Sequence, residues 1–93
     1  MEQIKVKILY FAKIKEIMKK GVDEIQISNS NTTIKGKEVF ELVINKNTNL
    51  SHELKPVFDT CLISLNDEYV DRDEEITLKS GDELSILPPI SAG

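Results

Sequence analysis

The chain has 93 residues, 40% of them hydrophobic and 30% charged, which suits one small domain and excludes a large enzyme with a cleft between two lobes. One cysteine and one histidine exclude a disulfide framework, a multi-thiolate zinc site and a cysteine-ligated iron–sulfur cluster within this chain. The net charge of -4 argues against nucleic-acid binding, which needs a basic surface to replace counterions.

Residues 3–11 alternate in polarity, which predicts a half-buried strand. One face carries the apolar set Ile4, Val6, Ile8 and Tyr10. The other face begins with lysines and ends with Leu9 and Phe11. We expect Phe11, an aromatic residue at the end of a strand, to be exposed and available to a partner.

A change of period predicts a short helix over residues 12–20, ended by Gly21. Residues 23–28 alternate again and predict a second strand. The apolar residues of this strand, Ile25 and Ile27, stand at odd positions. Val22 does not fit this alternation and is assigned to the turn.

The middle of the chain predicts a polar loop over residues 28–33, followed by a helix over 34–46 that packs on the sheet. Residues 45–58 predict a loop with one helical turn around Leu50–Leu54. Because proline lacks a backbone N–H, Pro56 is expected to end any helix there.

The last third predicts short strands separated by polar turns. The strands are expected at 60–65, 68–70, 74–78 and 83–87, with turns at 66–67 and 80–82. Pro88 and Pro89 end the last strand. The pattern predicts an α+β roll, a mixed sheet with a helix packed across one face. It forms one domain over residues 1–88, followed by a mobile tail over 89–93.

Few residues have the spacing that catalysis or metal binding requires. Cys61 lies in an apolar run and is expected to be a buried small hydrophobe, and His52 is expected to be exposed. The densest acidic cluster, which lacks the spacing of a calcium loop, is expected to be a solvated turn: Asp71, Asp73, Glu74 and Glu75.

Charge is unevenly distributed along the chain. Residues 1–20 hold six lysines, whereas residues 66–83 are mainly acidic. This bias is interpreted either as an ordinary solvated surface or as a basic and an acidic edge that dock on charged protein surfaces.

The C-terminal residues suggest chemistry at the terminal carboxylate. Gly93 has no side chain to obstruct attack on that carboxylate. The short tail could enter a narrow tunnel, and the two prolines at its base would make it project stiffly: Pro88, Pro89, Ile90, Ser91 and Ala92. The alternative is a frayed end without function.

Three stretches resemble the small subunit of molybdopterin synthase, a sulfur carrier with the ubiquitin-like β-grasp fold. They are Leu9–Lys13 with Glu16-Ile17, Leu65-Asn66 with Glu68-Tyr69-Val70, and the run from Gly81 to Ser91. The last stretch is the most specific. The family ends in Gly-Gly, whereas this chain has Ala92 before Gly93. Ala92 is either a tolerated variant or a change that slows activation or transfer.

The resemblance implies a mechanism for Gly93. An activating enzyme of the ubiquitin-activating type uses ATP to adenylate the carboxylate, and a persulfide sulfur then displaces AMP to leave a thiocarboxylate. The tail inserts into the large subunit, where the sulfur passes to cyclic pyranopterin monophosphate in molybdenum cofactor biosynthesis. The small subunit binds no cofactor itself and is not catalytic alone.

The resemblance also implies partners. They are the large subunit, in a heterotetramer of two small and two large subunits, and the adenylating enzyme, with no nucleic acid and no membrane. The positions that match the family's docking face are Phe11, Tyr69 and Leu87. Strand alternation agrees for Phe11 and Leu87, and all three are predicted to form an exposed apolar patch. The expected location is the cytosol.

Two other classes of function remain open. A ubiquitin-like modifier would join Gly93 to lysines of target proteins, and an interaction module would have an inert tail. The sulfur carrier of the thiamine pathway is the nearest rival among sulfur carriers; it is usually shorter and lacks the aromatic-Ala-Lys stretch that begins at Phe11 here.

Overall fold

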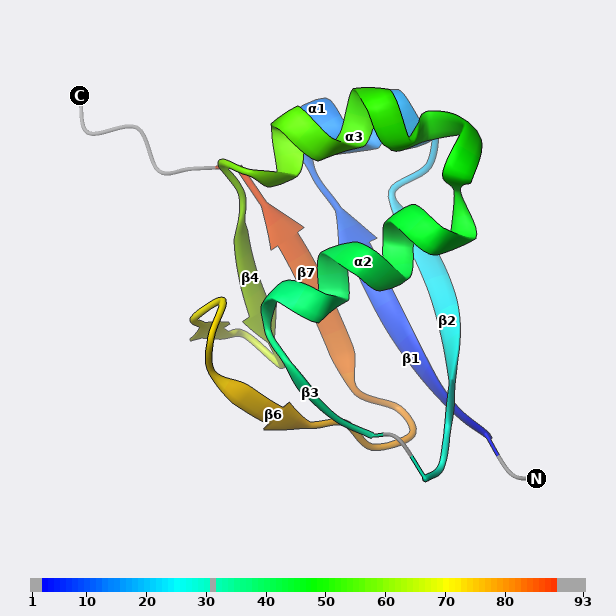
Figure 1. Cartoon of the computed structure of the whole chain (residues 1–93), viewed down its shortest axis with the longest axis vertical. Coiled ribbons are helices and arrows are strands. Elements are labelled where there is room, and N and C mark those ends of the chain that lie inside the picture. The colour runs from blue at the N-terminus through cyan, green and yellow to red at the C-terminus, as the bar shows by residue number, and fades with distance from the viewer. Residues whose placement is uncertain (1–2, 31, 89–93) are drawn as a thin grey trace.

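A computed structural model describes residues 3–30 and 32–88 (Figure 1). The strands in chain order are β1 (Gln3–Tyr10), β2 (Val22–Ser28), β3 (Thr33–Lys35), β4 (Leu62–Leu65), β5 (Glu68–Val70), β6 (Glu75–Thr77) and β7 (Glu83–Leu87). The helices are α1 (Ala12–Met18), α2 (Lys37–Lys46) and α3 (Ser51–Phe58), the last preceded by the 3-10 turn η1 (Thr48–Leu50). The predicted tail, residues 89–93, lies outside the described residues.

Five strands form one mixed sheet in the order β2-β1-β7-β4-β5. β1 and β7 run parallel at its centre, and the other neighbours pair antiparallel. β3 and β6 form a separate two-stranded sheet. In Figure 1, α2 and α3 lie across one face of the five-stranded sheet, and β7 ends near α3. This arrangement confirms the predicted α+β roll.

The alternation of apolar and polar side chains along β1 determines which face of the sheet the helices cover. Val6, Ile8 and Tyr10 are at most 1% exposed, as predicted, and they pack under side chains of α2 such as Val39 and Val43. Burying each of these large apolar side chains stabilises the fold by about 1.5–3 kcal/mol. The residues between them on β1 therefore point to the opposite, uncovered face.

The end of α1 differs from the prediction. The helix ends at Met18, and Lys19, rather than Gly21, adopts the left-handed conformation with φ 60°. The Lys19 N–H closes the helix by donating to the carbonyl oxygen of Lys15 at 2.9 Å. Because the helix stops early, the chain returns to the sheet one residue sooner, and Val22 belongs to β2 rather than to the turn.

β3 was missed by the sequence prediction, which assigned a helix to residues 34–46. The first residues of that segment pair with β6, with Ile34 opposite Ile76, and α2 begins only at Lys37. This pairing joins segments more than 40 residues apart, so no local period reveals it.

The prediction that Pro56 ends a helix is also wrong. α3 continues through Pro56 to Phe58. The missing proline N–H costs one helical hydrogen bond. Burial of the apolar side of α3 compensates for this lost hydrogen bond. Leu54 and Phe58 are buried in the core, and the centroid of the Phe58 ring lies 4.9 Å from that of the Phe40 ring.

Two predicted turns form, one between β4 and β5 at Asn66-Asp67 and one before β7 at residues 80–82. Asn66 and Asp67 have φ values of 49° and 71°, as a two-residue hairpin turn requires, and Gly81 has φ 92°. The amide of Asn66 ties the two turns together. Its Nδ2 donates to Asp82 Oδ1 at 3.1 Å, and its Oδ1 accepts the N–H of Glu83 at 3.0 Å.

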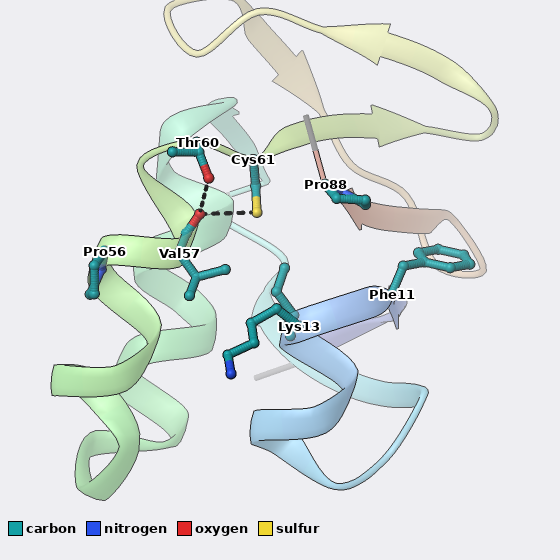
Figure 2. A pocket seen from close by; sticks show the side chains of 8 residues that line it. Phe11, Lys13, Pro56, Val57, Thr60, Cys61 and Pro88 are labelled. Carbon is teal, nitrogen blue, oxygen red and sulfur yellow. Dashed lines mark hydrogen bonds between the residues drawn. The ribbon is translucent and has the colours of Figure 1, made fainter. Parts of the chain in front are cut away.

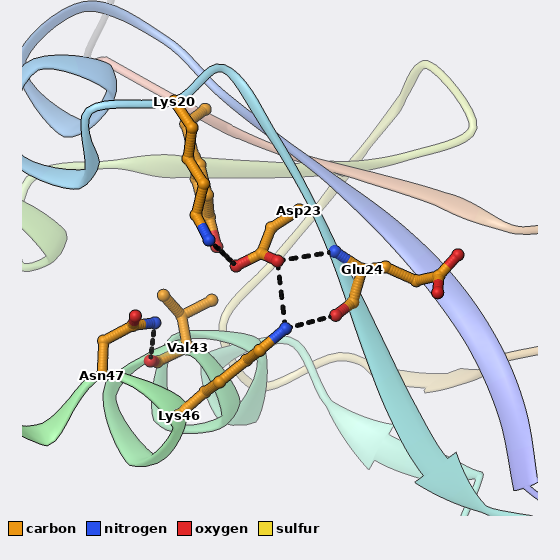
Figure 3. Close-up of polar contacts among 7 residues, drawn as sticks. Lys20, Asp23, Glu24, Val43, Lys46 and Asn47 are labelled. Carbon is orange, nitrogen blue, oxygen red and sulfur yellow. Dashed lines mark hydrogen bonds and ion pairs between the residues drawn. The ribbon is translucent and has the colours of Figure 1, made fainter.

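A second polar cluster fixes β2 to the rest of the fold (Figure 3). The Asp23 carboxylate, which is 8% exposed, accepts hydrogen bonds from the Tyr10 hydroxyl at 3.1 Å, Lys46 Nζ at 3.0 Å and the Glu24 N–H at 2.8 Å. Lys20 Nζ lies 3.3 Å from the same carboxylate. Burial acts to raise the pKa of Asp23, but these donors outweigh it and hold the pKa below its usual value.

Candidate functional site

Side chains from all five strands form an apolar patch on the face of the sheet opposite the helices. We call this set the open-face patch: Leu9, Phe11, Val22, Leu62, Tyr69 and Leu87. The strand register brings its members together, because Leu9 lies opposite Val22 and Leu62 lies opposite Leu87. The parallel pairing of β1 with β7 places Phe11, at the end of β1, beside Leu87.

Several members of the patch are open to solvent. Phe11 is 41% exposed, Tyr69 64%, Val22 50% and Leu62 36%, whereas Leu87 is partly buried. Exposed apolar side chains gathered at one site are typical of protein contact surfaces, so this patch is a candidate docking surface. The sequence analysis singled out Phe11, Tyr69 and Leu87, and the structure brings these three onto one face.

Three members of the patch were not among the predicted docking residues. Leu9 was placed on this face by strand alternation but was not singled out as a contact. Val22 was missed because it was assigned to a turn, although the alternation of β2 can be extended back to it. Leu62 was missed although Ser64, two residues further on, is the polar position of the same face, because the other residues from Cys61 to Leu65 are apolar.

Two serines lie at the centre of the patch. Ser64 and Ser85 lie opposite each other on β4 and β7 and are 5% and 7% exposed, since larger neighbours surround them. Tyr69 is paired with Ser64, and Leu9 with Ser85. The patch therefore has two small polar side chains between Leu9 and Tyr69.

A pocket of about 350 Å³ lies beside the end of β7 (Figure 2). Its wall includes Phe11 and Pro88, so it adjoins the open-face patch. Figure 2 shows Thr60 Oγ1 and Cys61 Sγ both directed at the Val57 carbonyl oxygen, at 2.9 and 3.1 Å. Burial raises the pKa of the Cys61 thiol, which keeps it protonated and poorly nucleophilic. The expectation of a buried, structural Cys61 is confirmed.

The remaining polar candidates lie on the surface. His52 is exposed on α3, and the acidic cluster is exposed in and after the turn between β5 and β6. Within that turn, Glu74 Oε1 accepts the N–H of Asp71 at 3.2 Å, so a hydrogen-bonded turn explains the cluster. Among the described residues, no three His, Cys, Asp or Glu side chains are arranged to hold a metal ion. The described helices are all too short or too polar to cross a membrane.

The charge bias of the sequence does not separate into two ends of the sheet, because Lys7 on β1 lies opposite Glu83 on β7. β7 runs from the acidic turn at Asp82 towards Pro88. α1, with lysines such as Lys13 and Lys15, lies at the Pro88 end. Lys5 and Lys7, however, stand on the open face, so the basic residues are divided between two surfaces.

Comparison with known proteins decides the family. The model of the ThiS family matches residues 8–93. The chain belongs to the ThiS family. It is 34% identical over 87 residues to the molybdopterin synthase sulfur carrier subunit of Dictyostelium discoideum, a match that covers 94% of each chain. The resemblance inferred from the three sequence stretches is thereby confirmed.

Two solved structures place this ThiS-family chain among β-grasp proteins. One is a complex of subunits 1 and 2 of the molybdopterin-converting factor from Helicobacter pylori, with 28% identity, a TM-score of 0.57 and coverage of 97% of this chain and 100% of the other. The second is small archaeal modifier protein 1 from Methanosarcina acetivorans, with 21% identity, a TM-score of 0.69 and complete coverage of both chains. The second likeness concerns the fold alone.

Of the predicted tail of this ThiS-family chain and the prolines at its base, only Pro88 lies among the residues that the structure describes. Pro88 follows β7, is exposed, and contributes to the pocket wall. The other predicted tail residues, including Ala92 and Gly93, lie outside the described residues.

Proposed function

We propose that this chain is the sulfur carrier subunit of a molybdopterin synthase and that the C-terminal carboxylate of Gly93 carries the sulfur. The observation that supports this most is the similarity, over nearly the whole length, to relatives that bear this name. The position of the open-face patch agrees with it, because Phe11 and Leu87 lie at the end of the sheet from which the tail departs.

The proposed chemistry needs only the terminal carboxylate of this chain. A carboxylate has no good leaving group, so an adenylating enzyme joins it to the α-phosphate of ATP and releases pyrophosphate. The outer sulfur of a persulfide on the sulfur donor then attacks the acyl carbon and displaces AMP, which joins the chain to the donor through an S–S bond. A second thiol of the donor attacks the donor's own sulfur in that bond, so the Gly93 thiocarboxylate leaves and the donor is left with a disulfide. No group on the described surface of this chain is required for either step. ATP belongs to the activating enzyme, and this chain holds no cofactor of its own.

We propose that the open-face patch binds the large subunit while the tail enters that subunit's active site. The Helicobacter pylori structure, whose title names a complex of subunits 1 and 2, supports a partner of this kind. There the thiocarboxylate sulfur would pass to cyclic pyranopterin monophosphate. The proposal includes an assembly of two small and two large subunits. It also includes the cytosol, where a free thiol such as that of Cys61 stays reduced.

Intact mass spectrometry tests the proposal. The full chain is incubated with ATP, an adenylating enzyme of the molybdopterin pathway and a sulfur donor, and a chain lacking Gly93 serves as the control. Replacing one carboxylate oxygen with sulfur adds about 16 mass units, a covalent change that identifies the product. A gain of this size that needs Gly93 supports a sulfur carrier. Gly93-dependent attachment to lysines of other proteins, without that gain, would favour the modifier function instead.

A further inference from the structure

The backbone of Ala12 is strained. Ala12 has φ 52°, in the left-handed region that side chains with a Cβ rarely occupy. Glycine is the usual residue there, because it has no Cβ to clash with the following carbonyl. Strain of this kind persists only where the surrounding structure imposes it, and it gathers at binding sites.

Buried residues on both sides impose the conformation of Ala12. Tyr10 is 1% exposed, its N–H donates to the Gly21 carbonyl at 2.9 Å, and its hydroxyl donates to Asp23. Ile14 is also 1% exposed, and its N–H donates to the Phe11 carbonyl at 3.2 Å. Between these two anchors the chain must change from strand to helix, and the turn falls on Ala12.

The strain at Ala12 leaves Phe11 in strand geometry. Phe11 has φ -132° and ψ 157°, so the alternation of β1 continues for one more residue. Its ring therefore lies on the open face, beside Leu87, while its carbonyl already accepts the first hydrogen bonds of α1. One residue thus serves both the patch and the start of the helix.

We propose that Ala12 is a positioning residue: its left-handed backbone holds Phe11 on the open-face patch in the orientation that the large subunit binds. The inference rests on the proposed function for the identity of the partner. The strain at Ala12 lowers the stability of the fold, but it increases the affinity for the partner. The affinity is higher because the Phe11 side chain is already ordered before binding.

The test is Ala12→Gly in the full chain, with Lys19→Gly as the matched control. Lys19 has φ 60°, lies at the other end of α1 from Phe11 and is not a member of the patch. In both variants glycine relieves backbone strain in the folded chain, which raises the free energy of unfolding, and adds freedom to the unfolded chain, which lowers it. The relief of strain is the larger effect, so the free energy of unfolding should stay the same or rise. Ala12→Gly should bind the large subunit about three- to tenfold more weakly, since Phe11 must now be ordered on binding. Lys19→Gly should bind as the parent does.

Two results would overturn the proposal. One is unchanged affinity in Ala12→Gly; the other is an affinity loss that merely follows a loss of stability or occurs equally in Lys19→Gly. If the parent chain does not bind the large subunit at all, the proposed function fails instead. The role of Ala12 is then decided by the NMR order parameter of the Phe11 amide: a lower value in Ala12→Gly supports positioning, and an unchanged value refutes it.

Discussion

Replacing Tyr69 with alanine tests whether the open-face patch is a docking surface. Tyr69 is 64% exposed on β5, which corresponds to about 130 Å² if an aromatic side chain presents about 200 Å². At about 25 cal/mol per Å², complete coverage by a partner contributes about 3 kcal/mol. Tyr69→Ala should therefore weaken binding to the large subunit by up to about 100-fold.

The assay is isothermal titration of the large subunit with the parent chain and with Tyr69→Ala. His52→Ala is the matched control, because His52 is exposed on α3, which packs on the opposite face of the sheet. Both variants should fold, since only about a third of the Tyr69 side chain is buried. A change of less than about twofold in the dissociation constant of Tyr69→Ala would refute docking through this patch, since it would correspond to under about 0.5 kcal/mol.

Three further predictions concern the fold and the tail. Asp23→Ala leaves the buried Tyr10 hydroxyl without its acceptor and should lower the free energy of unfolding, measured in urea, by about 2–4 kcal/mol at pH 7. Because the folded pKa of Asp23 is lowered, the part of this difference that depends on the charged carboxylate should be present above about pH 4 and be lost as the pH falls through the folded pKa, so an equal difference at pH 2 would contradict the account. Gly36→Ala places a Cβ against the carbonyl oxygen of Asp71 and should lower the free energy of unfolding by about 1–3 kcal/mol, and an unchanged urea midpoint would refute that reasoning. Ala92→Gly should leave thiocarboxylate formation, followed by intact mass, as fast or faster, and slower formation would contradict the view that only the terminal carboxylate is essential.

The elements with a strong local pattern were predictable from sequence. The alternation of β1 fixed its core face, and the turn at Asn66-Asp67 has residues that tolerate positive φ. β3 could not be predicted, because its pairing with β6 depends on contacts distant in sequence. The passage of α3 through Pro56 was equally unpredictable, because burial of Leu54 and Phe58 outweighs the local propensity.

The candidate site was predictable in part for the same reason. The position of Phe11 on the open face follows from strand parity, which the register confirms. Leu62 was overlooked in a mainly apolar strand, although the polar Ser64 on the same face indicates that this face points outward. The left-handed backbone of Ala12 could not be predicted from the sequence, because it results from the fixed positions of the buried Tyr10 and Ile14.

Transfer of sulfur from Gly93 tests the central claim most directly. The thiocarboxylated chain is mixed with the large subunit and cyclic pyranopterin monophosphate, and the intact mass of the chain is followed in time. The account predicts a loss of about 16 mass units, a return to the carboxylate, only when both the large subunit and the pterin are present. A thiocarboxylate that persists in the complete mixture, or that is lost equally without the large subunit, would contradict it.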